Sequence, residues 1–280
     1  MGSAVQSDWV NSHLAARLPA AQAGFYYRAF NVGVVYQDKL SRIMTQIGFP
    51  VYARIVDRNE LRRLHERVAR LHAVVIFPLL ASLVVLAPLL VPLVFGSAWT
   101  PAVLPTQTLV VAGMVAAILT GYPQVMLAIG RPRALLNFNI AMLVVYAGAI
   151  LLASRHGLVA VSITASCVYV GILVGVYRFL LQRYVGISIA RLVPELGPAV
   201  ICCLALLAVT IPLAALLGTV CARPVTVAVT GSSGLIVYAL ALRTGFPSAW
   251  GDLNKLLVRV FPFLGQMRRN GALNAPVVAP

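Results

Sequence analysis

A stripe of polar and charged side chains stands out within residues 28–46, a stretch otherwise apolar enough for a membrane helix. Plotted at roughly 100° per residue, its members fall within an arc of about 120°. They are Arg28, Asn31, Asp38, Lys39, Arg42, Thr45 and Gln46. A charge facing lipid costs several kcal/mol on insertion scales, so this stripe is expected to face protein or a water-filled cavity.

Two interpretations of the stripe stay open. In the structural one, Asp38 and Arg42 form an ion pair four residues apart, and Lys39 extends to the aqueous interface. In the functional one, the positive charges, which outnumber the single carboxylate, bind an anion, and guanidinium groups suit phosphate oxygens. This second interpretation assigns anion or diphosphate binding to Arg28, Lys39 and Arg42, supported by Asn31, Asp38 and Gln46.

The composition predicts which elements position these residues. The chain has 280 residues, of which 60% are hydrophobic and 10% are charged, whereas a soluble domain is about 25% charged. Its apolar runs do not alternate with period two, as the strands of a membrane barrel would. We therefore predict an all-α integral membrane protein, a polytopic helical bundle of about seven transmembrane helices.

The expected helices follow from the apolar runs, which are long enough to cross about 30 Å of hydrocarbon. The expected spans are 24–50, 73–95, 105–128, 134–153, 158–181, 197–218 and 223–243. Residues 58–72 are amphipathic and are expected to lie along the cytoplasmic interface before turning into the next span. Residues 1–23 are expected to be the stub of a preceding helix, and 244–280 a cytoplasmic tail that begins with an amphipathic stretch.

The basic residues indicate how the helices cross the membrane. Segment 54–70 alone holds six arginines, and every second connection is rich in them, whereas the opposite connections carry only Arg155 and Arg223. The positive-inside rule places the arginine-rich connections and the C-terminus in the cytoplasm. These charges account for the net charge of +15, so they are expected to meet anionic lipid headgroups, and no nucleic-acid partner is expected.

Little in the chain points to catalysis or to a cofactor. The cysteines form no CxxC motif and the histidines lack metal-ligand spacing; they are Cys167, Cys202, Cys203, Cys221, His13, His65, His72 and His156. Only Asp38 among the acidic residues is expected inside the membrane, and no histidine accompanies it. We therefore expect no catalytic residue, no metal and no cofactor.

Several short pieces occur in a recognisable order: the run from Gly24 to Ala29, the pairs Phe49–Pro50 and Phe77–Pro78, the turn Gly96–Trp99, and "AIGRPRALLNF" at 128–138. In order and spacing they resemble the polysaccharide transport family of the MOP flippase superfamily, the Wzx-type exporters of lipid-linked oligosaccharides. The resemblance implies two lobes of helices around a central cavity. This chain matches only the C-terminal half, so the N-terminal lobe is expected to be absent.

The resemblance also implies a function. It predicts translocation (flipping) of a polyprenyl-diphosphate-linked oligosaccharide across a bacterial plasma (inner) membrane for surface polysaccharide biosynthesis, such as lipopolysaccharide or exopolysaccharide, by a truncated chain. The implied partners are that lipid-linked oligosaccharide, membrane lipids, and a polysaccharide polymerase or assembly machinery. The alternatives are a non-transporting fragment, a drug or cation antiporter of the same superfamily, and a membrane enzyme of polysaccharide assembly.

Overall fold

The structure is a computed structural model that describes residues 20–39, 41, 52, 55 and 57–260. This part of the chain is helical and contains no strand. Six helical segments in it are long and apolar enough to cross a membrane: Arg58–Phe95, Ser97–Ala128, Pro132–His156, Leu158–Tyr184, Ile189–Val220 and Arg223–Gly245. The predicted all-α polytopic class is therefore confirmed, and each of these segments contains most of one expected span. The seventh, 24–50, is helical where it is described, and most of its second half lies outside the described residues.

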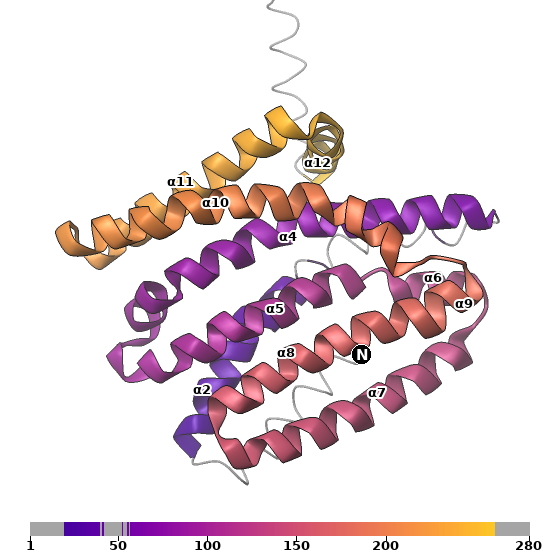
Figure 1. The fold of residues 1–280 in the computed structure, drawn as a ribbon, viewed down its shortest axis with the longest axis horizontal. Helices are drawn as coiled ribbons and strands as arrows, with labels where there is room; N and C mark the ends of the chain where they lie inside the picture. Colours follow the sequence, from indigo (N-terminus) through magenta and orange to yellow (C-terminus); the bar gives the residue numbers. More distant parts are fainter. Residues whose placement is uncertain (1–19, 40, 42–51, 53–54, 56, 261–280) are drawn as a thin grey trace, which may run out of the picture.

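The elements keep the labels of Figure 1. Before the first long helix come α2 (Ala20–Phe30), the π-helix η1 (Asn31–Val35) and further helical residues at 36–39 and 41. The rest are α4 (Arg58–Phe95), η2 (Ser97–Ala102), α5 (Val103–Leu119), α6 (Tyr122–Ala128), α7 (Pro132–Ala153), η3 (Ser154–His156), α8 (Leu158–Gly175), η4 (Val176–Leu181), α9 (Gln182–Tyr184), η5 (Ile189–Arg191), α10 (Leu192–Val220), α11 (Arg223–Gly245) and α12 (Pro247–Val260).

The long helices lie side by side in an order that differs from their order in the chain. Figure 1 shows α10, α4, α5, α8 and α7 as successive neighbours, with α11 packed on α10 and also touching α4. The first helix, α2, packs with η1 against α5. Helix α4 therefore lies at the centre of the molecule, between α10 on one side and α5 on the other.

Helix α4 corrects one expectation, because residues 58–72 and 73–95 form a single continuous helix. Its N-terminus is capped by Asp57, whose carboxylate accepts hydrogen bonds from the backbone N–H groups of Asn59 and Glu60 at 3.2 and 3.3 Å. The predicted turn between an interfacial helix and a span is wrong. Part of the face of these first turns is buried within the protein, at Leu61 and Ala69 among others.

The segment 20–41 approaches α5 at backbone distance. A methyl group added to Gly113 of α5 would overlap the backbone carbonyl oxygen of Gly33, and one added to Gly33 would lie 3.2 Å from Leu109. Two glycines therefore let η1 and α5 pack without intervening side chains. This contact fixes which face of the charged segment is buried.

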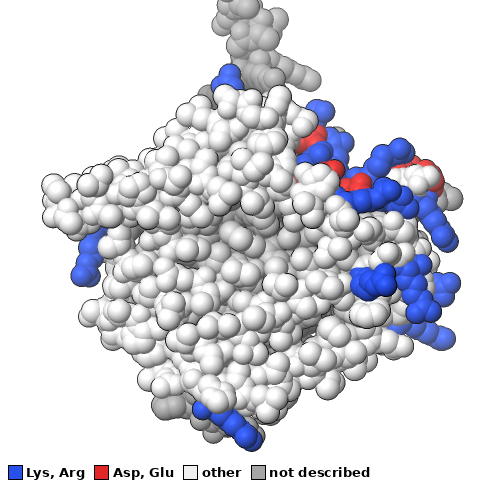
Figure 2. Space-filling model, viewed as in Figure 1, with Lys and Arg blue, Asp and Glu red and all other residues white. Residues whose placement is uncertain are grey.

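Charge is distributed unevenly over the surface. Figure 2 shows most basic side chains along one edge, over the beginning of α4 and near α6 and α9, and the acidic side chains lie there too. The remaining visible surface is almost free of charge. The arginine-rich connections therefore come together at one end of the helices, and the side of the membrane that this end faces stays a prediction.

Candidate functional site

Four of the six predicted site residues lie in the described part of the chain. They are Arg28, Asn31, Asp38 and Lys39. Arg42 and Gln46 lie outside the described residues, as does the Asp38–Arg42 ion pair proposed for this helix. The geometry of the site can therefore be built from residues 20–39 and 41.

The segment 20–41 has one buried and one exposed face. On the buried face, Tyr26 is 1% exposed and its hydroxyl lies 3.4 Å from the hydroxyl of Tyr146 on α7. On the other side, Arg28 and Lys39 are exposed, and so are two tyrosines, Tyr27 and Tyr36. The two described cations thus lie outside the buried face of the segment, and whether they border a water-filled cavity stays a prediction.

Arg28 lies against aromatic rings near the end of α4. Its guanidinium carbon is 5.1 Å from the ring centroid of Phe95 and 5.6 Å from that of Trp99. Trp99 in turn meets Phe25 edge to face, with centroids 5.4 Å apart. Cation–π contacts of this kind orient the guanidinium plane, and its N–H donors remain able to bind phosphate oxygens.

Lys39 lies in a different place along the segment. Its ammonium nitrogen is 5.4 Å from the ring centroid of Tyr36. Eleven residues separate it from Arg28, or about 16 Å along a helix axis at 1.5 Å per residue. The structure therefore does not bring these two cations to one phosphate group.

The π-helix explains why the uniform helical wheel is inaccurate here. In η1 the backbone bonds run from i to i+5, so a wider turn is inserted into the helix. One extra residue in a turn rotates everything that follows by roughly 100°. The arc of about 120° predicted for all the polar residues holds for a regular α-helix only, and the residues after Val35 point elsewhere than the wheel predicted.

The supporting residues are less exposed than the cations. The side-chain amide of Asn31 donates to the backbone carbonyl of Tyr27 at 2.7 Å, so part of its hydrogen-bonding capacity is used within the helix. Asp38 is partly buried.

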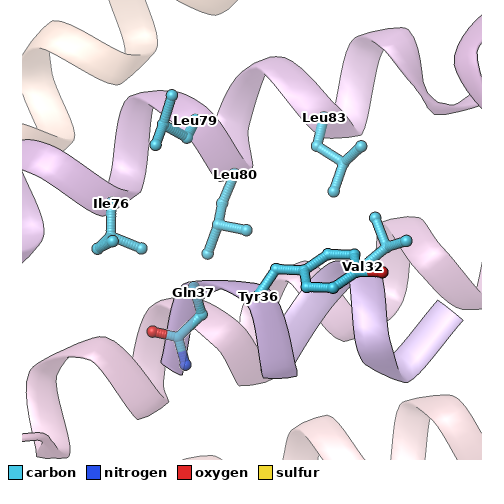
Figure 3. Close-up of a pocket in the computed structure, with 7 residues that line it drawn as sticks. All are labelled: Val32, Tyr36, Gln37, Ile76, Leu79, Leu80 and Leu83. Carbon is cyan, nitrogen blue, oxygen red and sulfur yellow. The ribbon is translucent and has the colours of Figure 1, made fainter. Parts of the chain in front are cut away.

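Sequence reasoning missed a groove beside this segment. It has a volume of about 270 Å³ and lies between residues 32–37 and the middle of α4 (Figure 3). Its lining residues are Val32, Tyr36, Gln37, Ile76, Leu79, Leu80 and Leu83. Leu79 is 46% exposed although its helix is central, and a pattern of apolar residues alone cannot distinguish such a position from one in contact with lipid.

A second feature missed from the sequence is an ion-pair cluster at the basic edge, which we call the α12 latch. Arg70 of α4 contacts Glu195 of α10 at 2.9 Å and Asp252 of α12 at 2.8 Å, and Arg67 also binds Asp252. Burial raises the pKa of Asp252, but hydrogen bonds from Arg67 and Arg70 outweigh it and lower the pKa overall. The amphipathic stretch predicted at the start of the tail is thus a helix that docks on α4.

His65 also differs from its predicted surroundings. Its ring nitrogen Nε2 lies 3.1 Å from the hydroxyl of Tyr177 on η4, and the side chain is 1% exposed. A methyl group on Gly121 would lie 3.3 Å from the other ring nitrogen. The histidine therefore joins α4, η4 and the start of α6, and the spacing of histidines along the chain gave no signal for it.

These observations define a polytopic helical membrane protein with an exposed cationic and aromatic helix face. A profile of the family described as "Polysaccharide biosynthesis protein" matches residues 13–104. Lipopolysaccharide biosynthesis protein WzxC of Escherichia coli K12 is 34% identical over 128 residues, which cover 45% of this chain and 26% of that protein. Together with the two further relatives below, these matches confirm the predicted resemblance: over part of its length the chain is similar to polysaccharide biosynthesis proteins.

Two other relatives agree with this assignment. Teichuronic acid biosynthesis protein TuaB of Bacillus subtilis is 26% identical over 181 residues, or 64% of this chain and 36% of that protein. An uncharacterised membrane protein in the cps region of Klebsiella pneumoniae is 28% identical over 145 residues, which cover 50% of this chain and 30% of that protein. The matches thus span between a quarter and just over a third of these relatives, and no solved structure matches the chain.

Proposed function

We propose that the chain forms part of a transporter that flips a polyprenyl-diphosphate-linked oligosaccharide across the plasma membrane of a bacterium. Support comes from the names of its relatives, which concern lipopolysaccharide and teichuronic acid biosynthesis. It also comes from the six apolar helices, which leave little chain between them for a folded soluble domain. A polymerase or other assembly machinery would then consume the exported oligosaccharide.

The single observation that carries this proposal is the exposed face of segment 20–41. Its buried face packs against α5 and α7, whereas Arg28 and Lys39 are left uncovered. Uncovered charges in a membrane helix are unfavourable in lipid and are found where a helix borders water or further protein. A cationic face of this kind suits an anionic substrate such as a diphosphate.

The separation of the two cations gives the proposal a more specific form. Because Arg28 and Lys39 lie about 16 Å apart along the axis, they do not hold one diphosphate together. We assign these two cations to successive contacts during translocation, with Lys39 at one depth and Arg28 at the other, and Arg42 remains a candidate anion contact from the sequence alone. Asn31, Asp38 and Gln46 would support these contacts through hydrogen bonds to sugar hydroxyls or to the cations.

The test is a set of chromosomal variants in the bacterium that carries the gene. Deletion of the gene is expected to abolish the surface polysaccharide and to leave its lipid-linked precursor in the cytoplasmic leaflet. Arg28→Gln and Lys39→Gln are expected to lower export about tenfold or more, since a charge-assisted hydrogen bond contributes roughly 1.5–3 kcal/mol.

Arg223→Gln is the matched control, because that arginine is exposed at the start of α11, a helix that packs on α10 and α4. It is expected to export normally. Membrane abundance is checked by blot for every variant. Normal export by both Arg28→Gln and Lys39→Gln at normal abundance would show that the cationic face serves packing or topology and not transport.

A further inference from the structure

The groove beside segment 20–41 has walls of nearly uniform chemistry. On the α4 side it is lined by Ile76 and three leucines. On the other side stand Val32, Tyr36 and Gln37, and Figure 3 shows the Gln37 amide turned away from the side chains of Ile76 and Leu80. That amide oxygen accepts a hydrogen bond from Ser41 at 3.3 Å. The surface presented to an occupant is therefore mostly aliphatic and aromatic.

A positive charge borders this apolar surface. Tyr36, which lines the groove, is 52% exposed, and the ammonium group of Lys39 lies 5.4 Å from the centre of its ring. Lys39 is itself exposed. The groove would thus suit an occupant that combines an apolar chain with a negative group. The apolar chain would contact the groove, and the negative group would contact Lys39.

The position of the groove along α4 fits the same combination. Arg70 is the last arginine of α4. Along the helix axis, Ile76 lies about 9 Å beyond it and Leu83 about 20 Å beyond it. Half of the hydrocarbon core measures about 15 Å. If the basic edge faces the cytoplasm, the groove runs from the region below the cytoplasmic headgroups to the middle of the bilayer.

We propose that this groove binds the prenyl chain of the lipid-linked substrate next to its phosphate, with Lys39 in contact with a phosphate oxygen. This rests on the proposed function and adds to it the place where the substrate lipid enters from the cytoplasmic leaflet. The groove extends over about 10 Å of α4, so it accommodates the phosphate-proximal part of one chain. The remainder of the chain would stay in the bilayer.

The direct test places a photoreactive p-benzoyl-phenylalanine at position 79, in the gene product expressed from its own locus. A matched control carries the same residue in place of Leu143, which is exposed on α7, remote from the groove. After illumination, adducts are identified by mass spectrometry. The probe at 79 is expected to capture polyprenyl phosphate lipids, and the probe at 143 ordinary phospholipid.

Three results would overturn the proposal: phospholipid alone at position 79, a peptide of the same protein or of another at position 79, or equal capture of prenyl lipid at both positions. The adduct at 79 is also expected to fall several-fold in the Lys39→Gln background and to be unchanged in the Arg223→Gln background. An adduct that does not depend on Lys39 would refute the phosphate contact.

A second variant separates this proposal from the proposed function. Leu79→Trp fills the exposed groove and is expected to reduce export several-fold at normal abundance, whereas Leu143→Trp is expected to have no effect. If gene deletion abolishes the surface polysaccharide but Leu79→Trp exports normally, the transporter assignment stands and the groove assignment fails. If deletion leaves the polysaccharide unchanged, the proposed function itself fails.

Discussion

At the scale of single residues, two arginines stand in contrasting surroundings. Arg28 lies on the exposed face of segment 20–41, against aromatic rings, and has no carboxylate partner among the described residues. Arg70 is partly buried and binds two carboxylates from different helices. The proposed anion contact would use the N–H donors of Arg28, whereas Arg70 uses its donors to join α4, α10 and α12.

The α12 latch gives a prediction for Asp252. Asp252→Asn removes the charge shared by Arg67 and Arg70, and is expected to destabilise the docked α12 by about 1–3 kcal/mol at neutral pH. Limited proteolysis of the purified protein would measure this as faster cleavage after α11. Glu60→Gln is the control, since Glu60 is an exposed carboxylate outside the described ion pairs. Equal cleavage rates for Asp252→Asn and the wild type would contradict a docking role.

The same carboxylate predicts a pH dependence with a definite sign. The pKa of Asp252 is lower in the folded protein than its ordinary value, so the ionised form favours docking. The stabilisation is fully present above the ordinary carboxyl pKa of about 4 and is lost as the pH falls through the folded value. The wild type and Asp252→Asn are therefore expected to differ in cleavage rate at pH 7, and to converge in strongly acidic buffer. A difference that persists there would exclude titration of Asp252 as its origin.

At the scale of elements, the contact between η1 and α5 decides how the charged segment is held. Backbone meets backbone at Gly33 and Gly113, so the segment cannot rotate about its axis without losing this contact. The buried face is fixed by the glycines, and the exposed face follows from it. The direction in which Arg28 and Lys39 extend from the bundle therefore depends on the packing of Gly33 against Gly113.

This contact predicts that Gly113→Ala is harmful. The added methyl group would overlap the carbonyl oxygen of Gly33, which belongs to the backbone and cannot turn aside. Overpacking of this kind costs about 1–3 kcal/mol, seen as a lower melting temperature and lower membrane abundance. Gly148→Ala is the control, because no atom lies within 4 Å of a methyl group there. If the two variants are equally stable, the close packing of η1 on α5 is not a determinant of stability.

The elements also show what the sequence could and could not predict. Six spans were predictable because each is a long apolar run, and length and composition suffice for that. The continuity of α4 was not predictable, because an amphipathic pattern over 58–72 does not reveal whether its apolar face meets lipid or protein. The π-helix at 31–35 leaves no mark in composition, so the exposed cations were found but their mutual placement was not. The groove arises from the packing of two helices and belongs to neither sequence segment alone.

For the whole molecule, the helix order places basic connections at one end. The start of α4, the turn into α7 and the end of α9 are far apart in the chain, yet they lie along one edge (Figures 1 and 2). An arginine-rich edge is predicted to face the cytoplasm, because cytoplasmic connections carry an excess of arginine and lysine and the cytoplasmic leaflet carries anionic headgroups. The orientation of the groove and of the proposed translocation path follows from this placement.

Labelling of single cysteines with an impermeant maleimide tests the orientation. The four native cysteines are first replaced, and a cysteine is then introduced at His156 or at Arg133, both of which are exposed. His156→Cys is expected to react in intact cells, and Arg133→Cys only after the membrane is permeabilised. The reverse pattern would invert the molecule and would place the groove in the outer leaflet.

The π-helix at Asn31–Val35 has a consequence for comparing this chain with its relatives. A wide turn holds one more residue than a regular turn of α-helix. The helix therefore contains one extra residue, although it spans the same distance across the bundle. A relative with a regular α-helix at this point would be one residue shorter, and its alignment would require a single-residue gap inside a helix. Without that gap, every position from 36 onward in the segment would be compared with the wrong counterpart, and the cation equivalent to Lys39 would be sought one residue away from its place.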